Sequence, residues 1–230
     1  MKISPIKSSR EIVLIEKACK LGDLTFSYVL KKIKTGITEK QISLEIQRFI
    51  RKNNAKLSFR PIVAFGKNSS EPHHKANNTK LQKGNIVKLD LGVKLNGYCS
   101  DMTRTVFIGK TSNKQKRVYQ TVLKAQQKGI DYVKTNCKTF DVDKLVRNYI
   151  IEKGFPSIPH TLGHGIGKKT HEYFRLGPKS KMILKDGMTF TIEPGIYIKG
   201  FGGVRIEDTI VLEKKGARLL THSPKNIIEL

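Results

Sequence analysis

Apolar and small residues near the start of the chain recur at alternating steps of four and three, the spacing of one face of an α-helix. These positions are Ile15, Cys19, Gly22, Phe26, Val29 and Ile33. The preceding Ser8-x-x-Glu11 has the form of a capping box, which marks the first turn of a helix. Gly36 is a typical helix terminator. The pattern therefore predicts an amphipathic helix between Ser8 and Gly36.

Three further helices are predicted downstream. One begins at the second capping box, Thr38-x-x-Gln41. Its apolar face consists of Ile42, Ile46 and Phe49. The other two cover residues 115–134 and 140–153, and Gly154 ends the last of them.

Short apolar runs between and after these helices are typical of β-strands. They are Pro61–Phe65, Ile86–Leu91, Thr103–Ile108, Thr189–Ile192 and Val204–Leu212. Helices and strand pairs alternate, and no Pro/Ser-rich linker separates them. We therefore expect an α+β fold in which residues 1–230 form a single domain.

An internal repeat connects the two halves of the chain. Lys83–Gly92 matches Asp186–Gly195, because each segment contains, in this order, a Gly, a predicted strand, a carboxylate and a second Gly. A second strand that starts with a carboxylate follows each copy. The four carboxylates are Asp90, Asp101, Glu193 and Glu207. Two such hairpins could face each other across a pseudo-twofold axis, which would bring all four carboxylates together.

Carboxylates on apolar strands need a partner, because a buried charge is costly unless it is paired or bound to a cation. One explanation is a set of separate salt bridges, with Arg104 and Arg205 as the obvious partners. The chain has only 19 acidic residues, and four of them occupy repeated positions. A shared metal site explains that repetition better.

Histidines cluster beside the same strands. His160, His164 and His171 lie within a Gly-rich segment before the Glu193 strand, and His73-His74 precede the Asp90 strand. Oxygen ligands with one or a few imidazoles suit Mn, Fe, Co or Zn. The number of carboxylates is enough to bridge two metal ions, an arrangement that activates water and polarises a carbonyl.

Five of these residues, with their flanking motifs, resemble the ligand signature of the pita-bread metallopeptidases. They are Asp90, Asp101, His164 in Gly-His-Gly-Ile-Gly, Glu193 in Ile-Glu-Pro-Gly, and Glu207 in Gly-Gly-Val-Arg-Ile-Glu-Asp-Thr. That family includes methionine aminopeptidases, aminopeptidase P and prolidases. The resemblance runs from the Ser8 helix to about Leu220, and it implies the α+β pita-bread fold with its pseudo-twofold repeat.

Other motifs are similar to the proline-specific branch, which comprises Xaa-Pro dipeptidase and aminopeptidase P. They are Ser100-Asp101-Met-Thr-Arg-Thr-Val, Asn68-Ser-Ser-Glu-Pro-His-His74, His160-x-x-x-His164 and His171-Glu-Tyr-Phe-Arg175. Proline-specific members usually carry an extra N-terminal domain, whereas the present sequence starts almost at the catalytic domain. A methionine aminopeptidase-like enzyme therefore remains an alternative.

The resemblance also implies a role for each site residue. Asp90 would bind one divalent ion, His164 and Glu193 the other, and Asp101 and Glu207 would bridge both. The family favours Mn or Co. Glu193 would also accept and pass on the proton of the attacking water.

Four further residues would face the substrate. The resemblance implies that His73 and His171 contact the scissile amide and act in catalysis. His160 would be a substrate-binding residue. Arg175 would lie near the C-terminal side of the substrate, where a dipeptide ending in proline presents a carboxylate. The implied substrates are short peptides with proline at the second position.

Composition sets limits on the remaining possibilities. The 44 Lys and Arg residues exceed the acidic ones to give a net charge of +25, spread along the chain. That charge alone does not predict specific nucleic-acid binding, although a non-catalytic scaffold that binds protein or nucleic acid is an alternative of another class. No apolar stretch reaches the ~20 residues of a membrane span. With no secretory signal and three scattered Cys, a cytoplasmic protein is expected. A homodimer is left open.

Overall fold

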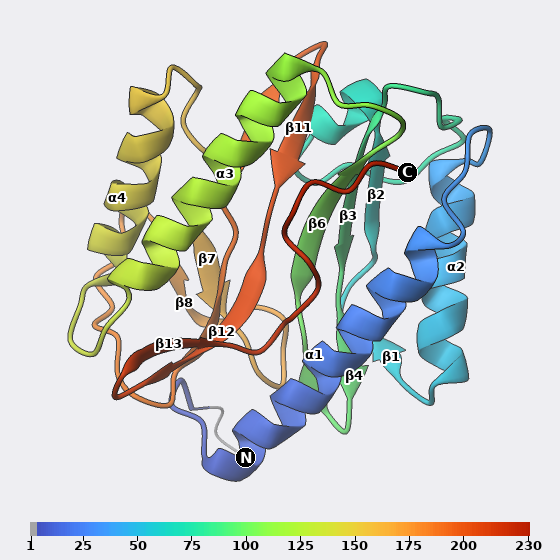
Figure 1. Cartoon of the computed structure of the whole chain (residues 1–230). Helices are drawn as coiled ribbons and strands as arrows, with labels where there is room; N and C mark the ends of the chain where they lie inside the picture. The colour runs from blue at the N-terminus through green and yellow to red at the C-terminus, as the bar shows by residue number, and fades with distance from the viewer. Residues whose placement is uncertain (1–3) are drawn as a thin grey trace.

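The computed structural model describes residues 4–230, which form two pairs of helices packed against β-sheets. In Figure 1 the first pair lies on the right and the second on the left, with the strands between and behind them. The helices are α1 (Ser9–Leu30), α2 (Glu39–Lys52), α3 (Asn113–Tyr132) and α4 (Thr139–Glu152). The four predicted helices are therefore confirmed.

Capping interactions determine where most of these helices begin. The predicted capping boxes at Ser8 and Thr38 both form, with side chain and backbone bonded reciprocally. A third capping box, Ser112 with Gln115, starts α3 at Asn113, so the predicted start at residue 115 was two residues late. The first helix ends at Leu30 instead of continuing toward Gly36, because the last backbone bonds tighten into i→i−3 turns.

The strands of the described residues form four small sheets, two from each half of the chain. The first half contributes β1 (Lys56–Leu57), β2 (Ile62–Phe65), β3 (Ile86–Leu91), β4 (Val93–Leu95), β5 (Tyr98–Cys99) and β6 (Met102–Phe107), in the orders β2-β3-β6 and β1-β4-β5. The second half contributes β7 (Gly163–Gly165), β8 (Glu172–Leu176), β9 (Thr189–Ile192), β10 (Gly195–Ile198), β11 (Gly202–Arg205), β12 (Asp208–Glu213) and β13 (Gly216–Leu219), in the orders β13-β12-β9-β7-β8 and β10-β11.

The internal repeat of the sequence corresponds to a repeat of structure. In the first half β3 pairs antiparallel with β6, with Leu91 opposite Met102. In the second half β9 pairs antiparallel with β12, with Ile192 opposite Asp208. A pair of helices precedes each hairpin. The repeat therefore covers whole helix-and-strand units, and it places the predicted carboxylates at equivalent ends of two hairpins.

The predicted strand Val204–Leu212 is wrong as a single element, because it is broken at Ile206-Glu207. Before the break, β11 pairs with β10; after it, β12 pairs with β9 and β13. At the break the backbone N–H of Glu207 donates to the carbonyl of Thr103, 3.1 Å away, in the other half of the chain. The chain therefore changes partners at the residue that carries a site carboxylate.

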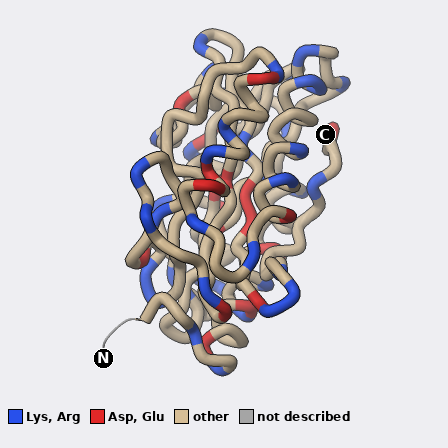
Figure 2. Tube along the Cα trace, turned by 90° about the vertical axis from the view of Figure 1, so that its left-hand side faces the viewer, with Lys and Arg blue, Asp and Glu red and all other residues tan. Residues whose placement is uncertain are grey.

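Each half encloses its own hydrophobic core. Phe26, Ile46 and Leu89 belong to the first core, whereas Val122 and Phe190 belong to the second. Over residues 4–230, no helix is both long enough and apolar enough to cross a bilayer. Basic positions are distributed along the whole trace in Figure 2, as the even charge distribution of the sequence predicts.

Candidate active site and metal centre

A cavity of about 300 Å³ receives side chains from both halves of the chain. All nine residues predicted for the site line it: Asp90, Asp101, His164, Glu193, Glu207, His73, His160, His171 and Arg175. The first half supplies three of them and the second half six. The structure therefore brings together residues that are up to 134 positions apart in the sequence, as the facing hairpins predicted.

Three of the predicted metal ligands converge most closely. One ligand atom from each of Asp101, His164 and Glu207 lies within 4.8 Å of the other two. Asp101 immediately precedes β6, His164 is the central residue of β7, and Glu207 lies at the break between β11 and β12. Glu193, directly after β9, approaches the same group, since its Oε1 is 3.4 Å from Nε2 of His164.

Several carboxylate oxygens at this point lack an ordinary partner. Asp90 Oδ1, Asp101 Oδ1 and Glu207 Oε1 are buried and accept no hydrogen bond from residues 4–230. A buried acceptor of this kind costs about 1–3 kcal/mol, and more when it is charged. Oxygen donors that are oriented together but unbonded are the arrangement that a divalent cation requires, so the residues fit metal ions.

The electrostatics of the carboxylates also favour a cation. Burial and the neighbouring Asp90 raise the pKa of Asp101 well above its usual range. Burial, followed by Asp101 and Glu193, does the same to the pKa of Glu207. Burial raises the pKa of Glu193 to about 7. These acids repel one another when ionised, and a positive ion among them would remove that cost.

The ring of His164 directs one nitrogen toward the carboxylates of Asp101 and Glu193. Its Nδ1 lies 3.3 Å from the carbonyl oxygen of Gly165, which can only accept, so we assign the ring proton to Nδ1. Burial lowers the pKa of His164, which keeps the ring neutral. Its Nε2 then faces Asp101 Oδ2 at 3.5 Å, acceptor toward acceptor. Metal-ligating histidines show this arrangement, with one nitrogen held by a carbonyl and the other free to bind.

Arg205 was not predicted as a site residue, yet it lines the cavity beside Asp90. It lies on β11, is 2% exposed, and donates from Nη2 to the carboxylate of Asp90. Its Nε donates to Thr103 Oγ1 at 3.0 Å, and Thr103 in turn donates to Glu207 Oε2 at 2.6 Å. The salt-bridge explanation is therefore correct for Asp90 and Arg205. Arg104 was also expected to pair with one of the four site carboxylates. It pairs instead with the carboxylate of Asp208, 2.6 Å away.

Tyr197 on β10 was also missed, and it determines what His160 can do. His160 Nδ1 lies 2.8 Å from the carbonyl of Thr161, so this nitrogen donates. Burial lowers the pKa of His160 to about 3, which leaves Nε2 as an acceptor for the Tyr197 hydroxyl, 2.8 Å away. Both ring nitrogens are therefore occupied. His160 lines the cavity with the carbon atoms of a neutral ring.

His73 and His171 lie at the mouth of the cavity. The ring of His171 is perpendicular to that of His164, with 4.2 Å between the ring centres, and the ring of His73 is 6.4 Å from that of His160. Burial lowers the pKa of His171 to about 4, and it also lowers the pKa of His73. Both rings are thus neutral at pH 7 and keep one N–H each to offer to a substrate.

A buried polar residue follows each of these two histidines and anchors its segment. His74 Nε2 lies 2.7 Å from the fully buried Glu39 on α2. Glu172 accepts from Lys7 at 2.5 Å, and both side chains are buried. His74 is therefore a loop anchor and does not line the cavity.

Comparison with known proteins agrees with this geometry. The chain is 39% identical over 225 residues to an Xaa-Pro dipeptidase of Pyrococcus horikoshii, covering 97% of this chain and 65% of that one. A solved Xaa-Pro dipeptidase from Bacillus anthracis superposes with a TM-score of 0.95 at 42% identity, over 98% of this chain and 64% of the other. A solved X-Pro aminopeptidase from Thermotoga maritima gives a TM-score of 0.95 at 35% identity, with coverage of 98% and 64%.

This chain thus spans less than two thirds of the length of each of these relatives. Its structure has their pita-bread fold, as the resemblance predicted. The sequence pattern of Metallopeptidase family M24 matches residues 13–214, a range that contains every residue of the cavity. The chain belongs to metallopeptidase family M24.

Proposed function

We propose that this protein is a dinuclear metallopeptidase that hydrolyses Xaa-Pro bonds at the N-terminus of short peptides. The observation that carries the proposal is the convergence of Asp101, His164 and Glu207, beside Asp90 and Glu193, with buried carboxylate oxygens that accept no hydrogen bond from the described residues. The names of the relatives support the choice of Xaa-Pro substrates. Residues 1–230 would act as one catalytic domain.

Metal ions would be held by all five ligands. In the proposal Asp90 would hold one ion, His164 and Glu193 would hold the other, and Asp101 and Glu207 would serve both. Divalent ions in this position, Mn or Co in preference to Fe or Zn, would activate water and polarise the scissile carbonyl. Arg205 and Thr103 keep Asp90 and Glu207 in place through the hydrogen bonds described above.

The remaining residues would position the peptide and move its protons. The carboxylate of Glu193 takes the proton of the attacking water and passes it to the leaving amine. The neutral rings of His73 and His171 donate to the scissile amide and so stabilise the charge that develops on its oxygen. The ring of His160 packs beside the proline.

Arg175 would bind the end of the substrate. It is exposed on β8 at the edge of the cavity, and its guanidinium makes only a 3.3 Å bond to the carbonyl of Phe174 among the interactions of the described residues. A guanidinium in this state can bind the free carboxylate of a dipeptide with two parallel hydrogen bonds. A methionine aminopeptidase-like activity is the alternative within the family. A non-catalytic scaffold is disfavoured, because all five candidate ligands are present and line one cavity.

The test is an assay of metal-depleted protein reconstituted separately with Mn, Co, Fe and Zn. Substrates are Ala-Pro, Ala-Pro-Ala and Met-Ala-Ser. We expect hydrolysis of the two proline peptides, restored most by Mn or Co. Cleavage of Met-Ala-Ser alone would favour the methionine alternative, and a reconstituted protein that cleaves none of the three would exclude catalysis of this class.

A cytoplasmic location belongs to the same proposal. The expected substrates are short peptides. Specific binding of nucleic acid to the Lys-rich surface is not part of the proposal. Fractionation of cells that produce the protein tests the location, since recovery in a membrane or secreted fraction would contradict it.

A further inference from the structure

A second cavity, of about 560 Å³, opens beside the catalytic one. The two cavities share Thr161 and Arg175, so they meet at the residue assigned to the C-terminal side of the substrate. A peptide that continues beyond proline would leave the catalytic cavity past Arg175. The second cavity is the space that it would enter.

The second cavity has a definite chemical character. Lys179 and Lys181 line it together with Arg175, whereas no Asp or Glu is among the described residues that line it. Phe174 and Met182 supply apolar surface. Three cations around an apolar patch favour a peptide segment with acidic side chains, since opposite charges attract and apolar stems pack on the patch.

The strand beside this cavity is suited to an extended peptide. β8 is the edge strand of its five-stranded sheet, so one side of its backbone has no neighbouring strand within residues 4–230. Edge strands commonly bind extended peptides through their backbone groups. Tyr173 and Arg175 are exposed on β8, while Phe174 and Leu176 are buried.

The backbone of β8 is also unusual at Tyr173. This residue has a φ of +43°, in the left-handed region that a bulky residue rarely adopts. Such a conformation concentrates at binding sites, where the surrounding structure holds it in place. Tyr173 is 58% exposed and lines this cavity.

We propose that this second cavity binds the part of the substrate that follows proline, and that it selects acidic residues there. The proposal rests on the function proposed above, and it adds a substrate class: Xaa-Pro peptides whose third and fourth residues are Asp or Glu. In a dipeptide, Arg175 holds the terminal carboxylate. In a longer peptide, Lys179 and Lys181 hold the acidic side chains.

The experiment compares three amidated tetrapeptides on the metal-reconstituted protein: Ala-Pro-Asp-Glu, Ala-Pro-Ala-Ala and Ala-Pro-Lys-Lys. The amide removes the terminal carboxylate, so only the side-chain charge differs. We expect kcat/KM to be about tenfold higher for the acidic peptide than for the basic one, given the small energy of exposed ion pairs. Raising the salt to about 1 M, where the Debye length is ~3 Å, should remove most of this preference.

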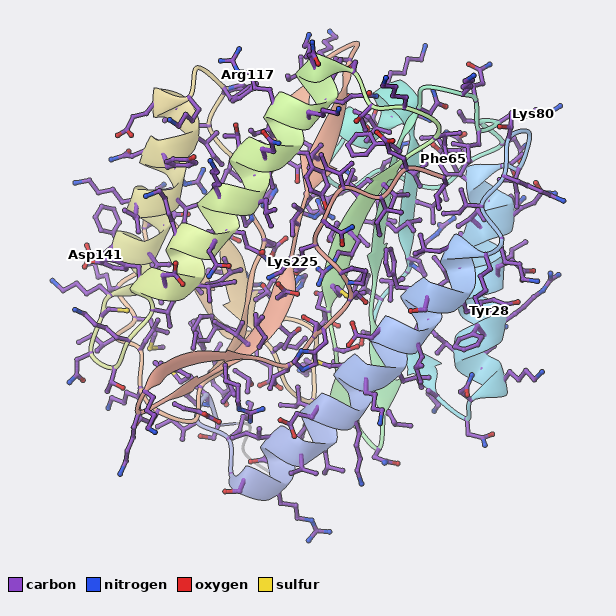
Figure 3. The ribbon with its side chains drawn as sticks, in the orientation of Figure 1. Tyr28, Phe65, Lys80, Arg117, Asp141 and Lys225 are labelled. Atoms are coloured by element: carbon purple, nitrogen blue, oxygen red, sulfur yellow. The ribbon has the colours of Figure 1, made fainter. Side chains whose placement is uncertain are left out.

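Variants then locate the effect. The double variant Lys179→Glu, Lys181→Glu should reverse the ratio of the acidic to the basic peptide. Its matched control is Lys116→Glu, Lys153→Glu, with the same change of charge in a separate basic cavity between α3 and α4. Arg117, labelled in Figure 3, lines that distant cavity. The control should keep the wild-type ratio.

Equal rates for the three tetrapeptides, or a control that changes the ratio as much as the test variant, would overturn this inference. Cleavage of Ala-Pro without any cleavage of the tetrapeptides would overturn it as well, and would leave the Xaa-Pro activity standing. A protein that cleaves neither Ala-Pro nor any tetrapeptide would remove the proposed function and this inference together. If the first variant does not fold, the milder double variant Lys179→Gln, Lys181→Gln replaces it. This variant should bring the kcat/KM values of the acidic and basic peptides close to each other without reversing their order.

Discussion

Arg205 on β11 donates to the carboxylate of Asp90 on β3, although 115 positions separate the two residues. Their pairing connects the two halves of the molecule at the wall of the catalytic cavity, which both residues line. Asp90 uses Oδ2 for this bond, whereas its Oδ1 accepts no hydrogen bond from the described residues. One oxygen is therefore held by the protein and the other is available to a cation.

The first prediction is that Arg205→Leu destabilises the metal-depleted protein by about 3–5 kcal/mol, because it leaves buried Asp90 without its partner. Urea unfolding measures the loss. Bound metal should reduce the loss, since a cation compensates the same carboxylate. The matched control is Arg218→Leu, whose guanidinium pairs with two exposed acids and should change stability by less than ~1 kcal/mol. Equal losses in the free energy of unfolding for the two substitutions would show that the buried pair stabilises the fold no more than the exposed one.

The second prediction concerns the metal content. Protein reconstituted with Mn or Co should contain two ions per chain by elemental analysis. Chelation should lower the free energy of unfolding, because a ligand present at a hundredfold excess over its Kd stabilises the native state by ~2.7 kcal/mol. Absence of bound metal, together with a melting temperature that Mn and Co leave unchanged, would refute the metal centre.

The third prediction is that Glu193→Gln reduces kcat by ~10²–10⁴-fold or more, because it removes the basic oxygen that handles the proton while keeping the volume. The fold should be retained. Glu152→Gln, at the end of α4, is the control for the same chemical change and should turn over normally. Turnover by Glu193→Gln close to that of the wild type, at full metal occupancy, would contradict the proton role.

The fourth prediction concerns Arg175. Arg175→Ala should lower kcat/KM for Ala-Pro by one or two tenfold steps, each worth ~1.4 kcal/mol, because it removes the partner of the substrate carboxylate. Ala-Pro amide should be affected much less. Arg175→Lys should restore only part of the loss, since an ammonium lacks the two parallel donors. The assignment fails if the ratio of the two substrates is the same in wild type and Arg175→Ala.

The fifth prediction is a dependence of stability on pH at the start of α1. The backbone N–H of Ser8 donates to the carboxylate of Glu11, and this bond is the main cause of the lowered pKa of Glu11. A lowered pKa stabilises the fold above the ordinary pKa of Glu, ~4.3, and the contribution is lost as the pH falls through the folded value. Glu11→Gln should therefore be slightly less stable than wild type at pH 6, and the difference should shrink toward pH 3. A difference that is constant from pH 6 to pH 3, measured by urea unfolding, would show that the charge of Glu11 does not contribute.

Local patterns accounted for most of the helices and for the candidate ligands. The capping boxes at Ser8 and Thr38 could be predicted because they are formed within four consecutive residues. The strand at 86–91 matched its observed bounds, since a short apolar run between turns is a local signal as well. The four candidate carboxylate ligands could be proposed because carboxylates on apolar strands are conspicuous, and because the repeat indicated that their strands would face one another; the candidate role of His164 came from the family resemblance.

Contacts over long sequence distances could not be predicted in this way. Arg104 and Arg205 are equally basic and lie on similar strands. Only the packing of β11 against β6, where Thr105 donates to the carbonyl of Arg205, brings Arg205 to Asp90 and leaves Arg104 with Asp208. Lys225, labelled near the centre of Figure 3, reaches the same Asp208 from the C-terminal segment. Which carboxylate each of these basic side chains pairs with therefore depends on which strands pack together.

The break at Ile206-Glu207 and the role of Tyr197 have the same origin. The apolar run from residue 204 to residue 212 has the composition of one strand, and only competition between two sheets for its backbone bonds divides it. Tyr197 contacts His160 because the β10-β11 hairpin folds over the cavity. Side-chain periodicity and capping act within a few residues and are therefore visible in the sequence, whereas the choice among distant partners is made by the packing of the two halves, which alone determines which polar groups share the buried site.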